Sequence, residues 1–235
     1  MSNKIAVIFD MDGVLVDSVN LNWRAINNVL SKFSIHLENE NITQYLGKTL
    51  YDQMEQLNEA YGLNLLFDNF QADVTSAKSA LFSSLPAKPG VLGLVKSLQD
   101  AGVPYIVATS ATNVIAQERL RSARLLKYFP SLITAEHVIK HKPHPDVYIK
   151  AASELGVKSR NCVVFEDAPA GVQAAKKASM KCIAIKSPFA STEQLEQANL
   201  VVDSLINVDL QMIQRIANSE EASKKDIRTP LYEEL

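Results

Sequence analysis

Short, continuous runs of apolar and β-branched residues recur along the chain, and helical patterns separate them. Four of these runs predict strands at residues 5–9, 105–108, 162–165 and 182–185. Because the runs do not alternate with polar residues, they are typical of parallel strands that are buried on both faces. Apolar residues at helical spacing predict helices at residues 91–98, 113–126, 145–155 and 170–178. Strands that alternate with helices predict an α/β fold with a doubly wound parallel sheet.

Residues 17–86 break this alternation, because they contain no convincing strand. Their spacing predicts three helices instead, at residues 21–33, 49–61 and 69–82. We therefore expect an α/β core made of residues 1–16 and 87–217, with a small helical unit at 17–86. Residues 83–89 have linker composition and are expected to form the return hinge. The remaining segment, 218–235, is expected to be a charged tail.

Composition and charge narrow the classes of function. The chain has 235 residues and a formal net charge of −2, which argues against broad nucleic-acid binding. Its apolar runs are far shorter than the roughly 20 residues that a membrane-spanning helix needs. The two cysteines, Cys162 and Cys182, imply no disulfide framework and fit a reducing compartment. We expect a cytoplasmic protein that is a monomer and binds neither nucleic acid nor membrane.

Polar side chains stand directly after three of the predicted strands. Ligands bind beyond the carboxyl ends of the strands in an open parallel sheet, so we expect these side chains to meet at one edge. A lysine, Lys142, stands in a loop just before a predicted helix and is expected to join them. The strand-end residues are Asp10, Asp12, Thr109, Ser110, Glu166 and Asp167.

The charges of this set indicate a cation and a phosphate. The four carboxylates carry −4 and Lys142 reduces the sum to −3. Crowded carboxylates raise one another's pKa unless a cation compensates, and oxygen ligands without a nearby His or Cys favour Mg²⁺ over zinc. Phosphate is the usual companion of Mg²⁺, and the Thr109 hydroxyl and Lys142 ammonium suit its oxygens. One acid is then left to attack phosphorus and another to donate a proton.

Four segments resemble, in order, the motifs of the haloacid dehalogenase superfamily. They are residues 9–18 (FDMDGVLVDS), 107–110 (VATS), 142–146 (KPHPD) and 164–175 (VFEDAPAGVQAA). A lone Asp-x-Asp motif would be weak evidence of a resemblance, whereas four motifs in the same order are specific evidence. The resemblance covers roughly residues 4–205. Its helical insert resembles the cap of the branch that contains β-phosphoglucomutase and phosphoglycolate phosphatase.

The resemblance implies a role for each strand-end residue. Asp10 is implied to attack phosphorus and form an aspartyl-phosphate, while Asp12 protonates the leaving oxygen and then activates water. Glu166 is implied to be either a metal ligand or a hydrogen-bond acceptor behind the metal. The other implied contacts are Thr109, Ser110 and Lys142 for the phosphoryl group, and Asp10, the backbone carbonyl of Asp12 and Asp167 for Mg²⁺.

Residues of the helical insert indicate whether the phosphoryl group is transferred to water or to a second sugar. Mutases of this branch place a His where this chain has Asn22, and a Lys and an Arg where it has Leu46 and Leu50. These departures favour a Mg²⁺-dependent phosphatase that acts on a small phosphorylated metabolite, such as a sugar phosphate. Two alternatives stay open: a β-phosphoglucomutase-type mutase and a non-catalytic scaffold that binds a phospho-ligand. The expected substrate contacts in the insert are Asn22, Gly47 and Lys48.

Overall fold

The computed structural model describes residues 4–18, 21–38, 42, 45, 49–82, 85–187 and 190–219. Its sheet has six parallel strands in the order β3-β2-β1-β4-β5-β6. The predicted α/β fold with a parallel sheet is confirmed, and the four predicted runs form its central strands. The bounds are β1 (Ala6–Phe9), β2 (Tyr105–Ala108), β3 (Leu132–Ile133), β4 (Cys162–Glu166), β5 (Lys181–Ile185) and β6 (Leu200–Val202).

The two edge strands, β3 and β6, were not predicted from the sequence. They have two and three residues, so neither forms an apolar run long enough to be recognised. The helix predicted at residues 113–126 was too long at its end. Helix α6 (Asn113–Ser122) stops earlier, because the chain turns at Arg124 with a φ of 58° before a 3₁₀ turn, η3 (Leu126–Tyr128).

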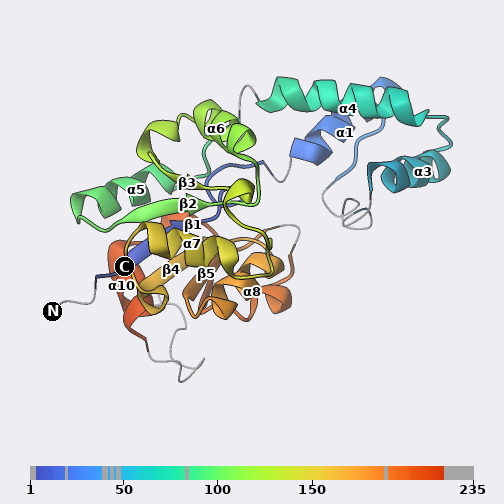
Figure 1. Ribbon diagram of the computed structural model, residues 1–235. Coiled ribbons are helices and arrows are strands. Elements are labelled where there is room, and N and C mark those ends of the chain that lie inside the picture. The colour runs from blue at the N-terminus through green and yellow to red at the C-terminus, as the bar shows by residue number, and fades with distance from the viewer. Residues whose placement is uncertain are drawn as a thin grey trace, which may run out of the picture.

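Helices cover both faces of the sheet (Figure 1). Successive strand residues point to opposite faces, so Phe9 joins one core cluster and Ile8 joins the other. The Phe9 face packs against α5 (Val91–Asp100), α6 and α10 (Leu210–Asn218). The Ile8 face packs against α7 (Asp146–Glu154), α8 (Pro169–Lys177) and α9 (Thr192–Leu195).

Three further helices form a separate group beside the sheet, which we call the three-helix cluster (Figure 1). They are α1 (Leu21–Leu30), α3 (Leu50–Tyr61) and α4 (Phe67–Phe82), and a 3₁₀ turn, η1 (Ser31–Phe33), follows α1. Their apolar faces bury a core of their own, which includes Trp23, Leu57 and Phe70. The predicted helices 21–33, 49–61 and 69–82 are thus found close to their expected bounds.

Two chain segments connect the sheet with the three-helix cluster, and they lie side by side. Val16 forms an antiparallel bridge with Ala87, and the Lys88 amide donates to the Leu15 carbonyl at 2.9 Å. Part of the expected hinge, residues 83–84, lies outside the described residues, as do residues 220–235 of the expected tail. Asn218 is the last residue of α10. No helix in the described part of the chain has the length and apolarity to span a bilayer.

Candidate active site

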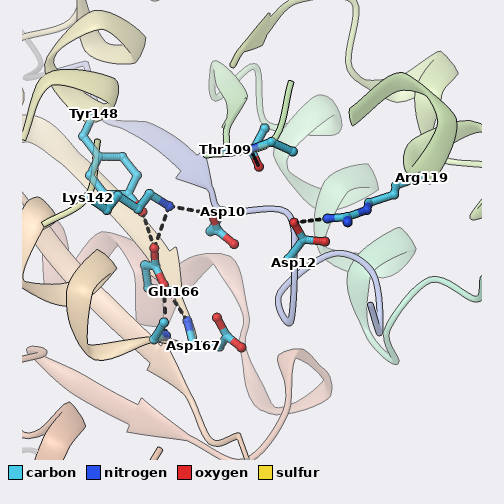
Figure 2. A network of polar contacts seen from close by, with 10 residues as sticks. Asp10, Asp12, Thr109, Arg119, Lys142, Tyr148, Glu166 and Asp167 are labelled. Atoms are coloured by element: carbon cyan, nitrogen blue, oxygen red, sulfur yellow. Dashed lines mark hydrogen bonds and ion pairs between the residues drawn. The ribbon is translucent and has the colours of Figure 1, made fainter. Parts of the chain in front are cut away.

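The carboxyl ends of β1, β2 and β4 bring acids and a hydroxyl to one edge of the sheet (Figure 2). Asp10, Thr109, Glu166 and Asp167 are buried there. One carboxylate oxygen from each of Asp10, Glu166 and Asp167 lies within 4.8 Å of the others. These residues line a pocket, which we call the strand-end pocket. Its volume is about 380 Å³, which suits a small ligand. It is also lined by Asp12, Ser110 and Lys142.

Lys142 joins the acids of two strands. Its Nζ lies 2.5 Å from Asp10 Oδ1 and 2.7 Å from Glu166 Oε1, and 4.7 Å from the centre of the Tyr148 ring. Burial acts to lower the pKa of Lys142, but the charges of Asp10 and Glu166 hold that pKa above its usual value. The ammonium therefore stays charged and offsets part of the negative charge in the pocket.

Both carboxylate oxygens of Glu166 are occupied by groups of the chain. Oε1 accepts from Lys142 and from the Tyr148 hydroxyl at 2.6 Å, and Oε2 accepts from the Asp167 and Ala168 amides. A Cβ at Gly171 would lie 1.6 Å from Glu166 Oε1, so only glycine lets the first turn of α8 approach so closely. Burial acts to raise the pKa of Glu166, but Lys142 and these hydrogen bonds hold it below its ordinary value. Glu166 is thus placed to orient its neighbours.

The negative charges of Asp10 and Asp167 are offset by fewer donors and cations than the charge of Glu166. Burial, reinforced by the neighbouring carboxylates, raises the pKa of Asp10 well above its ordinary value despite Lys142. Burial and the Glu166 charge raise the pKa of Asp167 to about 7. Within the described part of the chain, no hydrogen bond or ion pair reaches the Asp167 carboxylate. Gly13 has a φ of +79°, and a Cβ there would lie 1.8 Å from Asp167 Oδ2, so the turn after β1 needs glycine.

The donor set fits a hard divalent cation. Its side-chain ligand atoms are carboxylate oxygens, and the formal charge of Asp10, Glu166, Asp167 and Lys142 sums to −2. A divalent cation would bring that sum to zero and would relieve the repulsion that raises the pKa of Asp10 and Asp167. The three clustered carboxylates can therefore hold a metal ion.

Thr109 lies above Asp10 at the end of β2 (Figure 2). Its Oγ1 accepts from the Ala111 amide at 3.1 Å, which leaves the hydroxyl proton able to donate toward a ligand. Ser110, next in the chain, is exposed but lines the same pocket.

Asp12 lines the same pocket, but its carboxylate is not one of the three whose oxygens lie within 4.8 Å of one another. Arg119 of α6 forms an ion pair with Asp12 Oδ2 (Figure 2). The Ser18 hydroxyl contacts Asp12 Oδ1. Arg119 and Tyr148 were not predicted from the sequence as site residues. Neither residue directly follows a predicted strand or belongs to one of the four motifs, so no pattern in the sequence indicates them.

The three expected substrate contacts in the helical insert are only partly described. Asn22 lies in the first turn of α1 and is half-buried. Gly47 and Lys48 lie outside the described residues, as does Leu46.

Comparison with known proteins identifies the family. Residues 7–185 match the haloacid dehalogenase-like hydrolase family, so the chain belongs to it. A Thermotoga maritima protein named "Phosphorylated carbohydrates phosphatase" is 33% identical over 76% of this chain and 83% of its own length. The Arabidopsis thaliana protein "SUPPRESSOR OF QUENCHING 1, chloroplastic" is 32% identical over 87% of this chain, which spans 20% of that longer protein.

A solved structure gives the same assignment. The chain resembles a HAD family hydrolase from Deinococcus radiodurans, whose structure holds phosphate and sodium, with a TM-score of 0.78 and 25% identity. The match covers 87% of this chain and 93% of the other. This chain is thus a haloacid dehalogenase-like hydrolase, and a curated relative is a phosphatase.

Proposed function

We propose that the protein is a Mg²⁺-dependent phosphatase that hydrolyses a small phosphomonoester through an aspartyl-phosphate. One observation carries this proposal: Asp10 lies in the same pocket as Lys142, Thr109 and two further buried carboxylates. A carboxylate nucleophile, donors for phosphoryl oxygens and a cation site are what such a reaction needs. The Thermotoga relative named for phosphorylated carbohydrates favours a sugar phosphate or a similar metabolite as the substrate.

Asp10 and Asp167 are the proposed side-chain ligands of Mg²⁺, together with the backbone carbonyl of Asp12. Glu166 is proposed to act behind them, because both its oxygens already accept hydrogen bonds from the chain. When bound, Mg²⁺ would offset the negative charge of the phosphoryl oxygens and of the carboxylates.

The chain's own groups account for the proton and phosphoryl transfers. An Asp10 oxygen attacks phosphorus, and the bond from phosphorus to the leaving oxygen breaks. Lys142 and the Thr109 hydroxyl, with Ser110 beside it, hold the phosphoryl oxygens. Asp12 gives its proton to the leaving oxygen. In the second step, Asp12 accepts a proton from the attacking water, which releases phosphate and restores Asp10.

We further propose that the three-helix cluster is the cap of this enzyme. The cap would comprise residues 17–86, and residues 1–16 and 87–217 would form the core. Asn22, Gly47 and Lys48 are the proposed substrate contacts, and closure of the cap would exclude water during phosphoryl transfer. The buried free thiols of Cys162 and Cys182 support a reducing location such as the cytoplasm. We propose a monomer that acts alone on its metabolite.

Asp10→Asn tests the proposal. Phosphate release from a panel of metabolite phosphates, with and without Mg²⁺, is expected to fall by at least about 10³-fold for the variant. Asp100→Asn, at the exposed end of α5, is the matched control and should leave turnover unchanged. Phosphate release by the Asp10→Asn protein at the wild-type rate would refute the mechanism.

The mutase alternative gives a different product. The wild-type enzyme would be incubated with β-glucose 1-phosphate and a trace of the 1,6-bisphosphate. Formation of glucose 6-phosphate without free phosphate would support a mutase, whereas free phosphate supports the phosphatase. The family assignment speaks against a non-catalytic scaffold. That alternative would need a partner that binds through residues 218–235 and no turnover on any phosphate ester.

A further inference from the structure

The Asp12 carboxylate is held at both oxygens by groups outside the strand-end pocket. Arg119 Nη1, from α6, forms an ion pair with Oδ2 (Figure 2). The Ser18 hydroxyl, from the segment before α1, contacts Oδ1. The Arg119 side chain is 20% exposed and that of Asp12 is 28% exposed. Because both oxygens are bound, these partners select one orientation of the Asp12 side chain, in the pocket that it lines with Asp10 and Thr109.

Arg119 also contacts the end of the three-helix cluster. Its guanidinium lies 5.2 Å from the centre of the Phe82 ring, and Phe82 is the last residue of α4. Ser122, one turn further along α6, donates from Oγ to the Phe82 carbonyl and accepts from the Leu85 amide at 3.0 Å. Helix α6 therefore holds the end of α4 at two points, and one of them is the residue that binds Asp12.

Lys78 of α4 is influenced by the charge of Arg119. It stands four residues before Phe82 on α4, so the two share one face of the helix. Burial, followed by the charge of Arg119, lowers the pKa of Lys78. The charge of Arg119 thus disfavours the charged form of Lys78, and the Asp12 carboxylate, which pairs with Arg119, compensates one of the two cations.

We propose that Arg119 is a positioning residue that orients Asp12 for proton transfer and ties this orientation to the placement of α4 on the core. The inference rests on the proposed function, which gives Asp12 its proton-transfer role. Arg119 acts through Asp12 and is not assigned a contact with the substrate. Its planar guanidinium can bind Asp12 and stack on Phe82 at the same time, which an ammonium group does less well.

The physical reason is geometric. A proton donor must lie within hydrogen-bond reach of the leaving oxygen, and a misplacement of about 1 Å can cost about 10²-fold in rate. Without Arg119, the Asp12 side chain would lose its partner at Oδ2 and sample other rotamers. Only a fraction of the enzyme molecules would then have Asp12 in the correct orientation. This lowers kcat and leaves substrate binding unchanged.

The first test is Arg119→Gln, with Arg119→Lys as the conservative variant. We expect kcat on a metabolite phosphate to fall about 10- to 100-fold with KM within about 2-fold, and Arg119→Lys to recover part of the loss. Arg121→Gln, an exposed arginine in the last turn of the same helix, is the control and should match wild type. A raised KM with unchanged kcat, or a raised kcat, would overturn the proposal.

A double-mutant cycle with Asp12→Asn shows whether Arg119 acts through Asp12. An aryl phosphate has a good leaving group that needs little protonation, so it keeps the Asp12→Asn background measurable. In that background, Arg119→Gln should change kcat by less than about 2-fold. Losses that multiply across the two substitutions would contradict the positioning role.

Phe82→Leu keeps the ion pair but removes the stacking partner, and it serves if Arg119→Gln does not fold. We expect an intermediate loss in kcat, again without a change in KM, and a wild-type kcat would contradict the link to α4. Failure here is distinguishable from failure of the proposed function. If Asp10→Asn is inactive while the Arg119 and Phe82 variants match wild type, the phosphatase mechanism stands and the positioning role is wrong.

Discussion

The strand-end pocket and the three-helix cluster are built on opposite principles. The pocket is buried and charged, and Lys142 lies 2.5 Å from Asp10 and 2.7 Å from Glu166. The three-helix cluster buries apolar side chains, and its Lys32–Asp73 ion pair lies at the surface, with side chains that are 58% and 45% exposed. An exposed ion pair contributes little to stability, whereas a buried carboxylate that loses its partner is costly.

This difference separates what the two regions do. In the pocket, the polar groups fix each other's position and charge, so one substitution changes both stability and chemistry. In the three-helix cluster, the apolar core holds the helices together. The exposed polar side chains therefore contribute little to stability. Substitution of an exposed polar residue there that faces the substrate should therefore change which substrate is preferred while the fold remains intact.

Among the variants that test this comparison, Lys142→Met is expected to have the largest effect. The change removes a donor for the phosphoryl oxygens, and we expect kcat to fall by about 10²- to 10³-fold. It also leaves Asp10 and Glu166 without their cation, so the free energy of unfolding should drop by about 3–5 kcal/mol. Phosphate release and thermal unfolding, both measured with Mg²⁺ present, check the two expectations.

Lys140→Met is the matched control, because Lys140 is exposed and lies in the same loop. It should leave both measurements at their wild-type values. If Lys142→Met kept wild-type turnover, the pocket would not hold phosphate in the way proposed. If turnover were lost but the free energy of unfolding were unchanged, the buried ion pairs of the pocket would stabilise the fold no more than an exposed ion pair does. The contrast between the two regions would then be wrong.

A smaller effect concerns pH and Mg²⁺. The pKa of Asp167 is about 7 in the folded chain, against an ordinary value of 3.8. Between these values the folded state binds more protons than the unfolded state. Without Mg²⁺, the contribution of Asp167 is therefore fully present below about pH 4 and is lost as pH rises through about 7. Mg²⁺ binds deprotonated carboxylates, so it should raise Tm more at about pH 8 than at about pH 5.

Asp167→Asn supplies the comparison for this prediction. The variant should lose most of the Mg²⁺-induced rise in Tm at about pH 8 and should show a weaker dependence of its stability on pH without Mg²⁺. An equal Mg²⁺-induced shift at both pH values would show that no carboxylate of raised pKa takes part in cation binding. Asp203→Asn, an exposed acid after β6, should behave as the wild type.

Sequence reasoning was strongest where the chain's order alone brings residues together. Asp10, Thr109 and Glu166 each end or follow a parallel strand, and the topology of the sheet forces those strand ends to one edge. The position of Arg119 depends on which face of α6 meets the turn after β1, and no local pattern encodes that. The use of both Glu166 oxygens likewise depends on Tyr148 from another element. The edge strands were missed because two or three residues give no periodicity.

The smallest effect is expected in the three-helix cluster, from Asn22→Ala. Asn22 lies four residues after Ser18, which contacts Asp12, and we propose that it faces the leaving group of the substrate. Loss of one neutral hydrogen bond is worth about 1 kcal/mol, so kcat/KM should change about 5-fold for some metabolite phosphates and less for others. Thermal unfolding should stay unchanged, because no core contact is lost. Asn28→Ala, exposed on the same helix, is the control, and an equal change from both variants would mean that α1 plays no part in substrate choice.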